Sequence, residues 1–430
     1  MKVLQIASSD FFSTYGGGQI YVKNIVDEMI SQHRDIVVIS FLSNVQNSRY
    51  YKKSYKGIDL YELNECIGVS ELQAIIYSIK PDVIHAHSHK AQISKIGQIL
   101  HIPVVVTSHH GGIVCPVGTL MNCEDKICDV SVLHRNCLKC VLRNTRTGLL
   151  WCPLMRLIPR NAYIKLGKLL QRLPFVLLLT PIGSAALTIV RKQEEWETIV
   201  NGCDIMISPC YKLAEAMKRN GLPSEKTIVL PHGIPLPASI PPFPAITNGN
   251  IKFFYVGRIC YVKGLHILAE AFHRTDAPNA ELHIIGGAGN KAEQRYEKKL
   301  KSKYAKDHRI IWHGKVSPEN VYMTISNYHI SSSFSYLEAF GLNIAESLAM
   351  GKPVLATMNG GAEMQIEDGV NGWLIPQNNI GAMTDKMQEI ISDFKKYNVR
   401  LSTSKVISIE NHCLKLFDIY SNLVQANIGK

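Results

Sequence analysis

Short apolar segments alternate with segments of helical periodicity along this chain, and no other feature of the sequence constrains the fold as strongly. Residues 2–7, 35–41, 82–87 and 103–107 have the length and apolar content of buried strands. Strands that are separated by helices pair in parallel, so the pattern predicts an α/β fold with a doubly wound parallel sheet. The alternation starts again at residues 252–257, which predicts a second sheet of the same kind.

A proline-dense stretch that ends at Asn250 separates the two halves and is the best linker candidate. We expect an N-terminal Rossmann-like domain over residues 1–240 and a C-terminal one over 241–408. A cysteine-rich, basic insert over 113–192 interrupts the first domain. The last segment, 409–430, is expected to form a helix that packs toward the N-terminal domain.

The chain of 430 residues carries a formal net charge of +12, which points to an anionic partner. Nucleic acid, an anionic membrane surface and phosphorylated substrates all have this character. No standard nucleic-acid-binding motif accompanies the charge, so no nucleic acid is expected. A hydrophobic content of 46% excludes a disordered chain. No secretory signal is evident, and we expect a cytoplasmic protein whose eleven cysteines stay reduced.

Residues 130–193 contain no aspartate or glutamate, and their basic side chains are interleaved with apolar ones. A surface that is both cationic and apolar is typical of contact with an anionic membrane, so we expect peripheral attachment to the inner face of the cell membrane. A solvated basic face over a buried helix and a nucleic-acid-binding surface are the alternatives. The basic residues include Arg135, Lys139, Arg143, Arg146, Arg156, Arg160, Lys165, Lys168 and Arg172.

Six cysteines gather between residues 115 and 152. Clustered reduced thiols favour a metal site over disulfides. Cys123, Cys128, Cys137 and Cys140 are the candidate ligands of a structural zinc ion. An iron–sulfur cluster and unligated thiols remain alternatives, since the other spacings match no common zinc finger.

Two carboxylates, Glu338 and Glu346, flank Gly341 near the start of a predicted helix. A helix N-terminus offers free N–H groups and partial positive charge, which suit a phosphate. One carboxylate would then lie beside the phosphate and the other further along the same ligand. A nucleotide sugar is such a ligand, whereas on spacing alone an ordinary helix with a surface glutamate is equally compatible.

Other polar residues and glycines follow the predicted strands, where ligands bind in open parallel sheets. In the first half these are the loop that contains Gly17 and Gly18, and His109 after 103–107. In the second half, Arg258 and Lys263 follow the strand at 252–257.

These motifs together resemble the retaining glycosyltransferases of family 4. A glutamate–seven residues–glutamate element matches Glu338 and Glu346, and a Gly-Arg…Lys-Gly element matches Gly257-Arg258 and Lys263-Gly264. An Asn-Gly-Trp-Leu element matches 371–374, and the order agrees. The resemblance covers 201–425 well and the N-terminal half more loosely.

The resemblance implies the GT-B fold, in which two Rossmann-like domains face each other across a cleft and a C-terminal helix closes back on the N-terminal domain. It implies a hexosyltransferase of the surface-polysaccharide type, which moves a sugar from a UDP or GDP sugar to a sugar or lipid-linked acceptor. Glu338 and His109 would be catalytic. The donor-binding residues would be Gly17, Gly18, Arg258, Lys263, Gly341, Leu342 and Glu346.

The resemblance also implies retention of configuration without a protein nucleophile and without a catalytic metal, because two cations and a helix N-terminus would neutralise the leaving diphosphate. A nucleotide-sugar epimerase of similar fold is the alternative enzyme. A non-catalytic GT-B scaffold or nucleic-acid binder is the alternative from another class.

Overall fold

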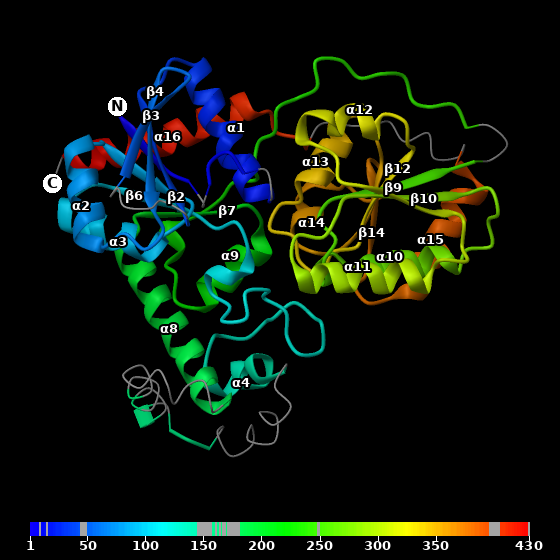
Figure 1. Ribbon diagram of the computed structural model, residues 1–430, viewed down its shortest axis with the longest axis horizontal. Helices are drawn as coiled ribbons and strands as arrows, with labels where there is room; N and C mark the ends of the chain where they lie inside the picture. The colour runs from blue at the N-terminus through cyan, green and yellow to red at the C-terminus, as the bar shows by residue number, and fades with distance from the viewer. Residues whose placement is uncertain are drawn as a thin grey trace. The chain divides into compact units, whose positions relative to one another are not determined.

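The computed structural model describes residues 1–7, 10–13, 16–43, 50–143, 181–246, 250–394 and 405–428, with a few single positions between 157 and 169. The chain forms two compact units, which are described separately below (Figure 1). Unit 1 consists of residues 1–10, 33–230 and 418–430. Unit 2 consists of residues 11–32 and 231–417.

Unit 1 contains a sheet whose described strands run in the order β3-β4-β2-β1-β5-β6-β7-β8. The strands are β1 (Val3–Ile6), β2 (Ile36–Leu42), β3 (Tyr50–Tyr55), β4 (Ile58–Asn64), β5 (Val83–Ala86), β6 (Val104–Thr107), β7 (Ile205–Ser208) and β8 (Thr227–Val229). The described helices are α2 (Val69–Ile79), α3 (Lys90–Leu100), α4 (His134–Leu142), α8 (Pro181–Gly202) and α9 (Tyr211–Arg219), with short 3-10 turns at Gly111–Ile113 and Ser224–Lys226.

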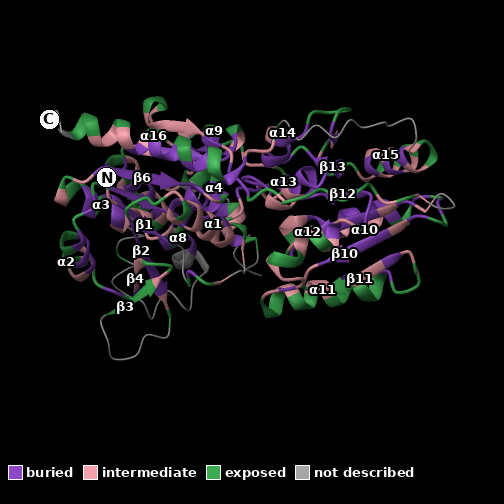
Figure 2. Ribbon diagram, turned by 90° about the horizontal axis from the view of Figure 1, so that it is seen from above, coloured by how far each residue is buried: buried purple, intermediate pink, exposed green. Residues whose placement is uncertain are grey.

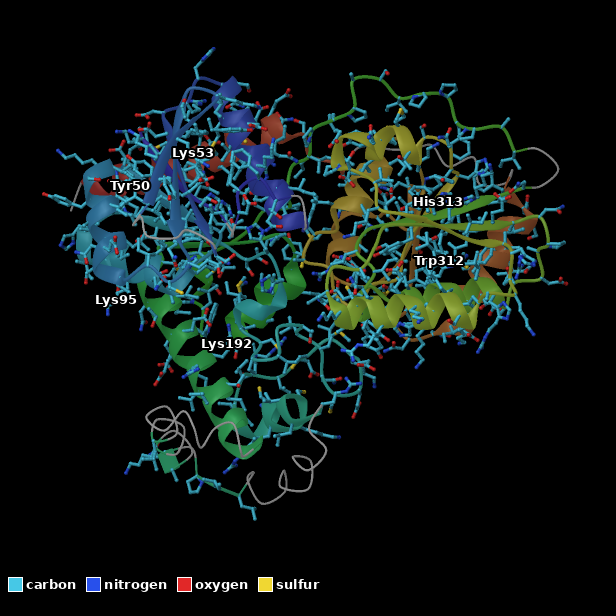
Figure 3. All side chains as sticks on the ribbon, viewed as in Figure 1. Tyr50, Lys53, Lys95, Lys192, Trp312 and His313 are labelled. Atoms are coloured by element: carbon cyan, nitrogen blue, oxygen red, sulfur yellow. The ribbon has the colours of Figure 1, made fainter. Side chains whose placement is uncertain are left out.

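The strands of unit 1 are parallel except for β3, which pairs antiparallel with β4 at the edge of the sheet. β1, β5 and β6 are buried along their whole length, as expected for strands covered on both faces. β3 is instead exposed and carries Lys52 and Lys53. Figure 3 labels Lys53 and Tyr50 on this strand. Charged side chains on an edge strand discourage pairing with another chain.

Unit 2 contains a parallel sheet whose described strands run in the order β11-β10-β9-β12-β13-β14. They are β9 (Lys252–Val256), β10 (Glu281–Ile285), β11 (Ile310–Gly314), β12 (Ile330–Ser333), β13 (Val354–Thr357) and β14 (Gly372–Ile375). The helices are α1 (Gly17–Ser31), α10 (Leu265–His273), α11 (Lys291–Lys303), α12 (Val321–Ile325), α13 (Leu342–Ala349), α14 (Gly361–Gln365) and α15 (Ile380–Ser392), with 3-10 turns at Tyr261–Lys263 and Pro318–Asn320.

Burial follows this layered arrangement in unit 2. Figure 2 shows the strands mostly buried, whereas α11 is largely exposed, with only Leu300 buried among its residues. The strand order reverses between β9 and β12, which are neighbours in the sheet but far apart in sequence. Ligands of doubly wound sheets bind beyond the carboxyl ends of the strands at such a switch point. The loops after β9 and β12 are therefore the first place to look for a site.

The last described helix, α16 (Ile409–Ile428), contributes to both units. In its first half, His412 Nε2 lies 2.7 Å from the Tyr21 hydroxyl within unit 2. In its second half, the Tyr420 hydroxyl lies 2.6 Å from His85 Nδ1 within unit 1. The predicted fold class, with two doubly wound sheets and a C-terminal helix that packs on the first of them, is confirmed.

None of the described helices combines the length and the apolar character that a membrane crossing requires. Much of the segment predicted to contact a membrane surface, 144–156 and 170–180, lies outside the described residues. The predicted membrane contact therefore stays a prediction.

Candidate active site

The loop between β12 and α13 is held in place by the loop that precedes α14. The Glu338 N–H donates to the Asn359 carbonyl at 3.0 Å, and the Gly361 N–H donates to the Glu338 carbonyl at 2.8 Å. A Cβ on Gly361 would lie 2.2 Å from the carbonyl oxygen of Phe340, so only glycine permits this approach. The backbone around Glu338 is thus fixed on both sides before any ligand binds.

The structure brings Lys263 and Glu338 together. Lys263 ends the 3-10 turn after β9, and its Nζ forms an ion pair with Oε1 of Glu338. The Ser335 hydroxyl donates to the same carboxylate oxygen at 2.6 Å, and the Glu338 side chain is only 9% exposed. Gly264 follows with φ of 66°, and a Cβ there would lie 2.0 Å from the Phe334 carbonyl oxygen. This glycine is what allows the lysine turn to approach the loop after β12.

Gly341 is the N-cap of α13, as the sequence predicts for a helix that begins behind it. Its φ of 83° lies in the left-handed region that favours glycine, and no side chain caps the helix. Leu342 is the first residue of α13, and the N–H groups bonded to the Gly341 carbonyl begin at Ile344, so those of Leu342 and Asn343 are open to an acceptor such as a phosphate oxygen. Within unit 2, a Cβ on Gly17 at the start of α1 would lie 3.2 Å from Cδ1 of Leu342. The structure therefore places Gly17 beside Leu342; Gly18 is the second residue of α1.

Glu346 lies in the same helix, α13, and is half-buried. The described residues place no cation within ion-pair distance of its carboxylate. Burial alone raises the pKa of Glu346 from its ordinary 4.5 to about 7, and its negative charge in turn helps to raise the pKa of the nearby Tyr322. A carboxylate that is desolvated and unneutralised is suited to accept hydrogen bonds from a ligand's hydroxyl groups.

Arg258 also follows β9, but its nearest recorded acid is not one of the predicted site residues. Its Nε lies 3.7 Å from Oε1 of Glu293, and its side chain is 42% exposed. Tyr255 donates from its hydroxyl to the Arg258 carbonyl at 2.8 Å, which fixes the backbone there. The role of Arg258 in binding a diphosphate stays a prediction.

His109 lies in unit 1, at the end of a chain of hydrogen bonds that begins on α16. The Gln5 amide donates to the Tyr420 hydroxyl at 3.3 Å, so Gln5 Oε1 is an acceptor and His87 Nε2, 3.0 Å away, donates to it. A neutral His87 then accepts at Nδ1 from His109 Nε2, which lies 3.0 Å away. The network fixes His109 in the tautomer that carries its lone pair on Nδ1.

Comparisons with known proteins agree with this geometry. The sequence profile of the family "Glycosyl transferases group 1" matches residues 239–404, and the profile "Glycosyl transferase 4-like" matches residues 12–127. Together they cover β2 to β6 of unit 1, the whole described sheet of unit 2 and most of the site residues described above. The chain belongs to the group 1, family 4-like glycosyltransferases. The resemblance to this family is confirmed, and its GT-B architecture agrees with the two sheets.

Curated relatives and solved structures are similar to this GT-B chain at low identity. The O-antigen chain mannosyltransferase C of Escherichia coli is 29% identical over 34% of this chain and 38% of the relative. A D-inositol 3-phosphate glycosyltransferase of Arthrobacter sp. (strain FB24) is 27% identical over 47% of this chain and 51% of the relative. The match thus spans about half of one relative's length and less of the other's. The crystal structure of Anabaena HepE in complex with UDP and glucose shares the fold, with a TM-score of 0.65 at 16% identity, over 98% of this chain and 99% of that chain.

The predicted zinc ligands of this glycosyltransferase all lie among the described residues. Burial, together with the charges of neighbouring thiols, raises the pKa of Cys137 to about 12 and that of Cys140 to about 11. Cys115, Cys123 and Cys128 are among those neighbours, so the thiols lie near one another. No three described His, Cys, Asp or Glu side chains are placed so as to hold one ion, however. The zinc site stays a prediction, which metal analysis of the purified protein tests.

The sequence analysis missed several residues of these two sites. Tyr420 and Gln5 are joined to the histidines only by the fold, and nothing in their sequence context marks them. Lys90, whose Nζ donates to the carbonyl of His87 in this network, was also missed, although it directly follows His89 and begins α3. Ser335, three residues before Glu338, is the kind of hydroxyl that orients a buried carboxylate.

Proposed function

We propose that this protein is a retaining glycosyltransferase that moves a sugar from a nucleotide-diphosphate sugar to an acceptor. The observation that carries the proposal is the Lys263–Glu338 ion pair beside the open N-terminus of α13, at the switch point of the unit 2 sheet. A cation, a buried carboxylate and a free helix N-terminus together suit a sugar diphosphate, which offers hydroxyl groups and negative charge to the same place.

In this proposal each donor-site group has one task. The diphosphate lies against the N–H groups of Gly341 and Leu342 and against Lys263, with Arg258 as a second cation. As the glycosidic bond breaks, the charge on the leaving nucleoside diphosphate grows, and these groups stabilise it in the transition state. Glu338 then accepts hydrogen bonds from the sugar hydroxyls, and Glu346 accepts them from the ribose. The UDP in the HepE complex supports a nucleotide donor of this kind.

In this proposal the acceptor hydroxyl attacks the anomeric carbon on the face from which the diphosphate leaves, so the anomeric configuration is retained. The leaving phosphate accepts the proton of the acceptor hydroxyl. Glu338 is held by Lys263 and Ser335 and serves to bind hydroxyl groups, so we expect no glycosyl-enzyme in mass spectra of turnover mixtures. Two cations and a helix N-terminus can neutralise the diphosphate, and we propose that transfer needs no metal. Unchanged rates in the presence of a chelator test this part.

The proposed acceptor is a lipid-linked glycan in bacterial surface-polysaccharide assembly. The support is the match to an O-antigen mannosyltransferase and the basic, apolar composition of residues 130–193. Flotation with anionic vesicles at low salt tests the membrane contact, because electrostatic attraction is strongest when little salt screens it. A protein that does not float with the vesicles under these conditions contradicts the proposed membrane contact.

A screen of nucleotide sugars by thermal unfolding tests the donor site. A true donor at 100 times its dissociation constant should stabilise the protein by about 2.7 kcal/mol, and the matching nucleoside diphosphate should also stabilise it. A transferase should then hydrolyse that donor slowly without an acceptor. A nucleotide-sugar epimerase would instead convert the donor into the epimeric nucleotide sugar, and a scaffold would leave the donor unchanged. No stabilisation by any nucleotide sugar would contradict the proposed function.

A further inference from the structure

Unit 1 contains a cavity of about 340 Å³ at the carboxyl ends of β5 and β6. This size falls in the range of small-molecule sites in proteins. His109 and His110 line it from the loop after β6, Lys90 and Gln92 from the first turn of α3, and Lys192 and Glu195 from α8. The donor-site assignments in unit 2 make no use of these residues.

Two ammonium groups line this cavity. Lys90 Nζ donates to the His87 carbonyl at 2.7 Å, which holds the half-buried lysine in place. Lys192 Nζ donates to the Gly112 carbonyl at 2.9 Å and lies 2.6 Å from Oε2 of Glu195. Glu195 balances one of the two cations, so the lining keeps a net positive charge. Burial lowers the pKa of Lys90 to about 8; Glu195 opposes this shift and Lys192 adds to it.

The first turn of α3 adds backbone donors to the same cavity. The helix begins after His89, whose φ is 48°, and no side chain caps it. The first backbone hydrogen bond of the helix runs from the Ile93 N–H to the His89 carbonyl, at 2.9 Å. The N–H groups of Lys90, Ala91 and Gln92 therefore precede the helical ladder. Among the described residues, the buried Oε1 of Gln92 has no hydrogen-bond partner, so it can accept a hydrogen bond from a hydroxyl group of the ligand.

We propose that this cavity binds a phosphoryl group of the acceptor. Half-buried ammonium groups and a helix N-terminus are groups that proteins use to bind phosphate. The inference rests on the proposed transferase function. His109, which the family resemblance makes a catalytic residue, lines the same cavity. A phosphoryl group in the cavity therefore lies close to the acceptor hydroxyl that receives the sugar. The acceptor is therefore a molecule whose reacting sugar or polyol carries the phosphoryl group directly.

Calorimetric titration with inorganic pyrophosphate tests the cavity. The protein used is the Lys263→Met/Glu338→Gln variant, in which the proposed donor-phosphate lysine is absent and no buried charge is left unpaired. We expect saturable binding, which an added Lys90→Met or Lys192→Met weakens by about tenfold or more. Glu195→Gln should strengthen binding, because it removes a repelling carboxylate.

Lys95→Met is the matched control. Lys95 is exposed on the same helix, α3, so its loss changes the net charge equally but leaves the cavity intact (Figure 3). The proposal would be overturned if pyrophosphate did not bind. It would also be overturned if Lys95→Met weakened pyrophosphate binding as much as Lys90→Met does. Nucleotide-sugar binding should be unchanged in the single Lys90→Met variant. A wild-type protein that binds no nucleotide sugar would contradict the transferase function but not the cavity's affinity for phosphate.

Two further arms identify the source of the phosphoryl group. If the acceptor is lipid-linked, wild-type and Lys95→Met protein should co-sediment with phosphatidylcholine vesicles that carry polyisoprenyl diphosphate. The Lys90→Met protein should stay in the supernatant. Glucose 1-phosphate should displace pyrophosphate, with no vesicle binding, if the acceptor is water-soluble. A failure of both phosphorylated compounds to bind would overturn an acceptor role for the cavity.

Discussion

Replacing Lys263 by alanine is expected to lower kcat/KM for sugar transfer by about a hundredfold to a thousandfold, the usual cost of removing one group that stabilises developing charge. Gly264 lets the 3-10 turn of Lys263 pack against the loop after β12, and the ion pair with Glu338 holds the lysine side chain there. The lysine therefore needs no reorganisation when the donor binds. Without Lys263, only the N-terminus of α13 and Arg258 remain to stabilise the negative charge on the leaving diphosphate. Initial rates with saturating acceptor measure the effect.

The same substitution should also destabilise the protein, because it leaves the Glu338 carboxylate buried with the Ser335 hydroxyl but without its cation. Such an unpaired buried charge costs about 1–3 kcal/mol or more. Glu338→Gln should abolish transfer with a smaller loss of stability. The double variant Lys263→Met/Glu338→Gln should be more stable than Lys263→Ala but equally inactive, since neither charge is then left alone.

Lys299→Ala is the control for these variants. Lys299 is exposed on α11, so its removal should change neither the rate nor the unfolding temperature. Retained turnover in Lys263→Ala or Glu338→Gln would contradict the assigned site. A double variant no more stable than the single one would show that the ion pair does not hold the loop in solution.

The sequence indicates where the candidate donor-site residues lie on the fold because their determinants are local; their role in donor binding stays a prediction. Strand ends, glycines with special backbone angles and a helix start are all written within a few residues of Glu338, and Gly341 caps α13 where the pattern places the helix. The contact between Lys263 and Glu338, by contrast, joins residues 75 positions apart and depends on two strands being neighbours. Only the resemblance to a known family could suggest it.

β3 and α8 are among the elements that were not predicted, for identifiable physical reasons. β3 is an exposed edge strand without the apolar alternation that marks buried strands, so Tyr50–Tyr55 gave no signal. α8 begins at Pro181, inside an uncharged stretch interrupted by proline and glycine. A proline at the first position of a helix is favourable, although the same residue inside a helix would break it. The hydrogen bonds that join His85 and Gln5 to the Tyr420 hydroxyl span more than 300 residues and depend on α16 packing on unit 1.

Glu346→Gln is expected to stabilise the protein while weakening donor binding. Between pH 4.5 and about 7 the folded protein binds the Glu346 proton more tightly than the unfolded chain does, because the pKa is raised in the fold. Stability of the wild type therefore falls as pH rises through this window, by up to about 3 kcal/mol. Glutamine does not titrate. The variant should thus equal the wild type below pH 4.5 and exceed it above pH 7, which denaturant unfolding at both pH values measures.

Glu367→Gln, at an exposed position, is the control and should show no such pH-dependent gain in stability.

The affinity for the donor should change with pH in the direction opposite to that of wild-type stability. If Glu346 accepts hydrogen bonds from ribose hydroxyls, the ligand prefers the ionised carboxylate, so a nucleotide sugar, whose diphosphate does not titrate in this range, should bind more weakly as pH falls below 7. Binding near pH 6 should then release a proton, which calorimetry in buffers of different ionisation enthalpy detects. Because Glu346→Gln removes the titrating group, it should abolish that proton release, whereas Lys263→Ala should weaken binding and leave the release in place.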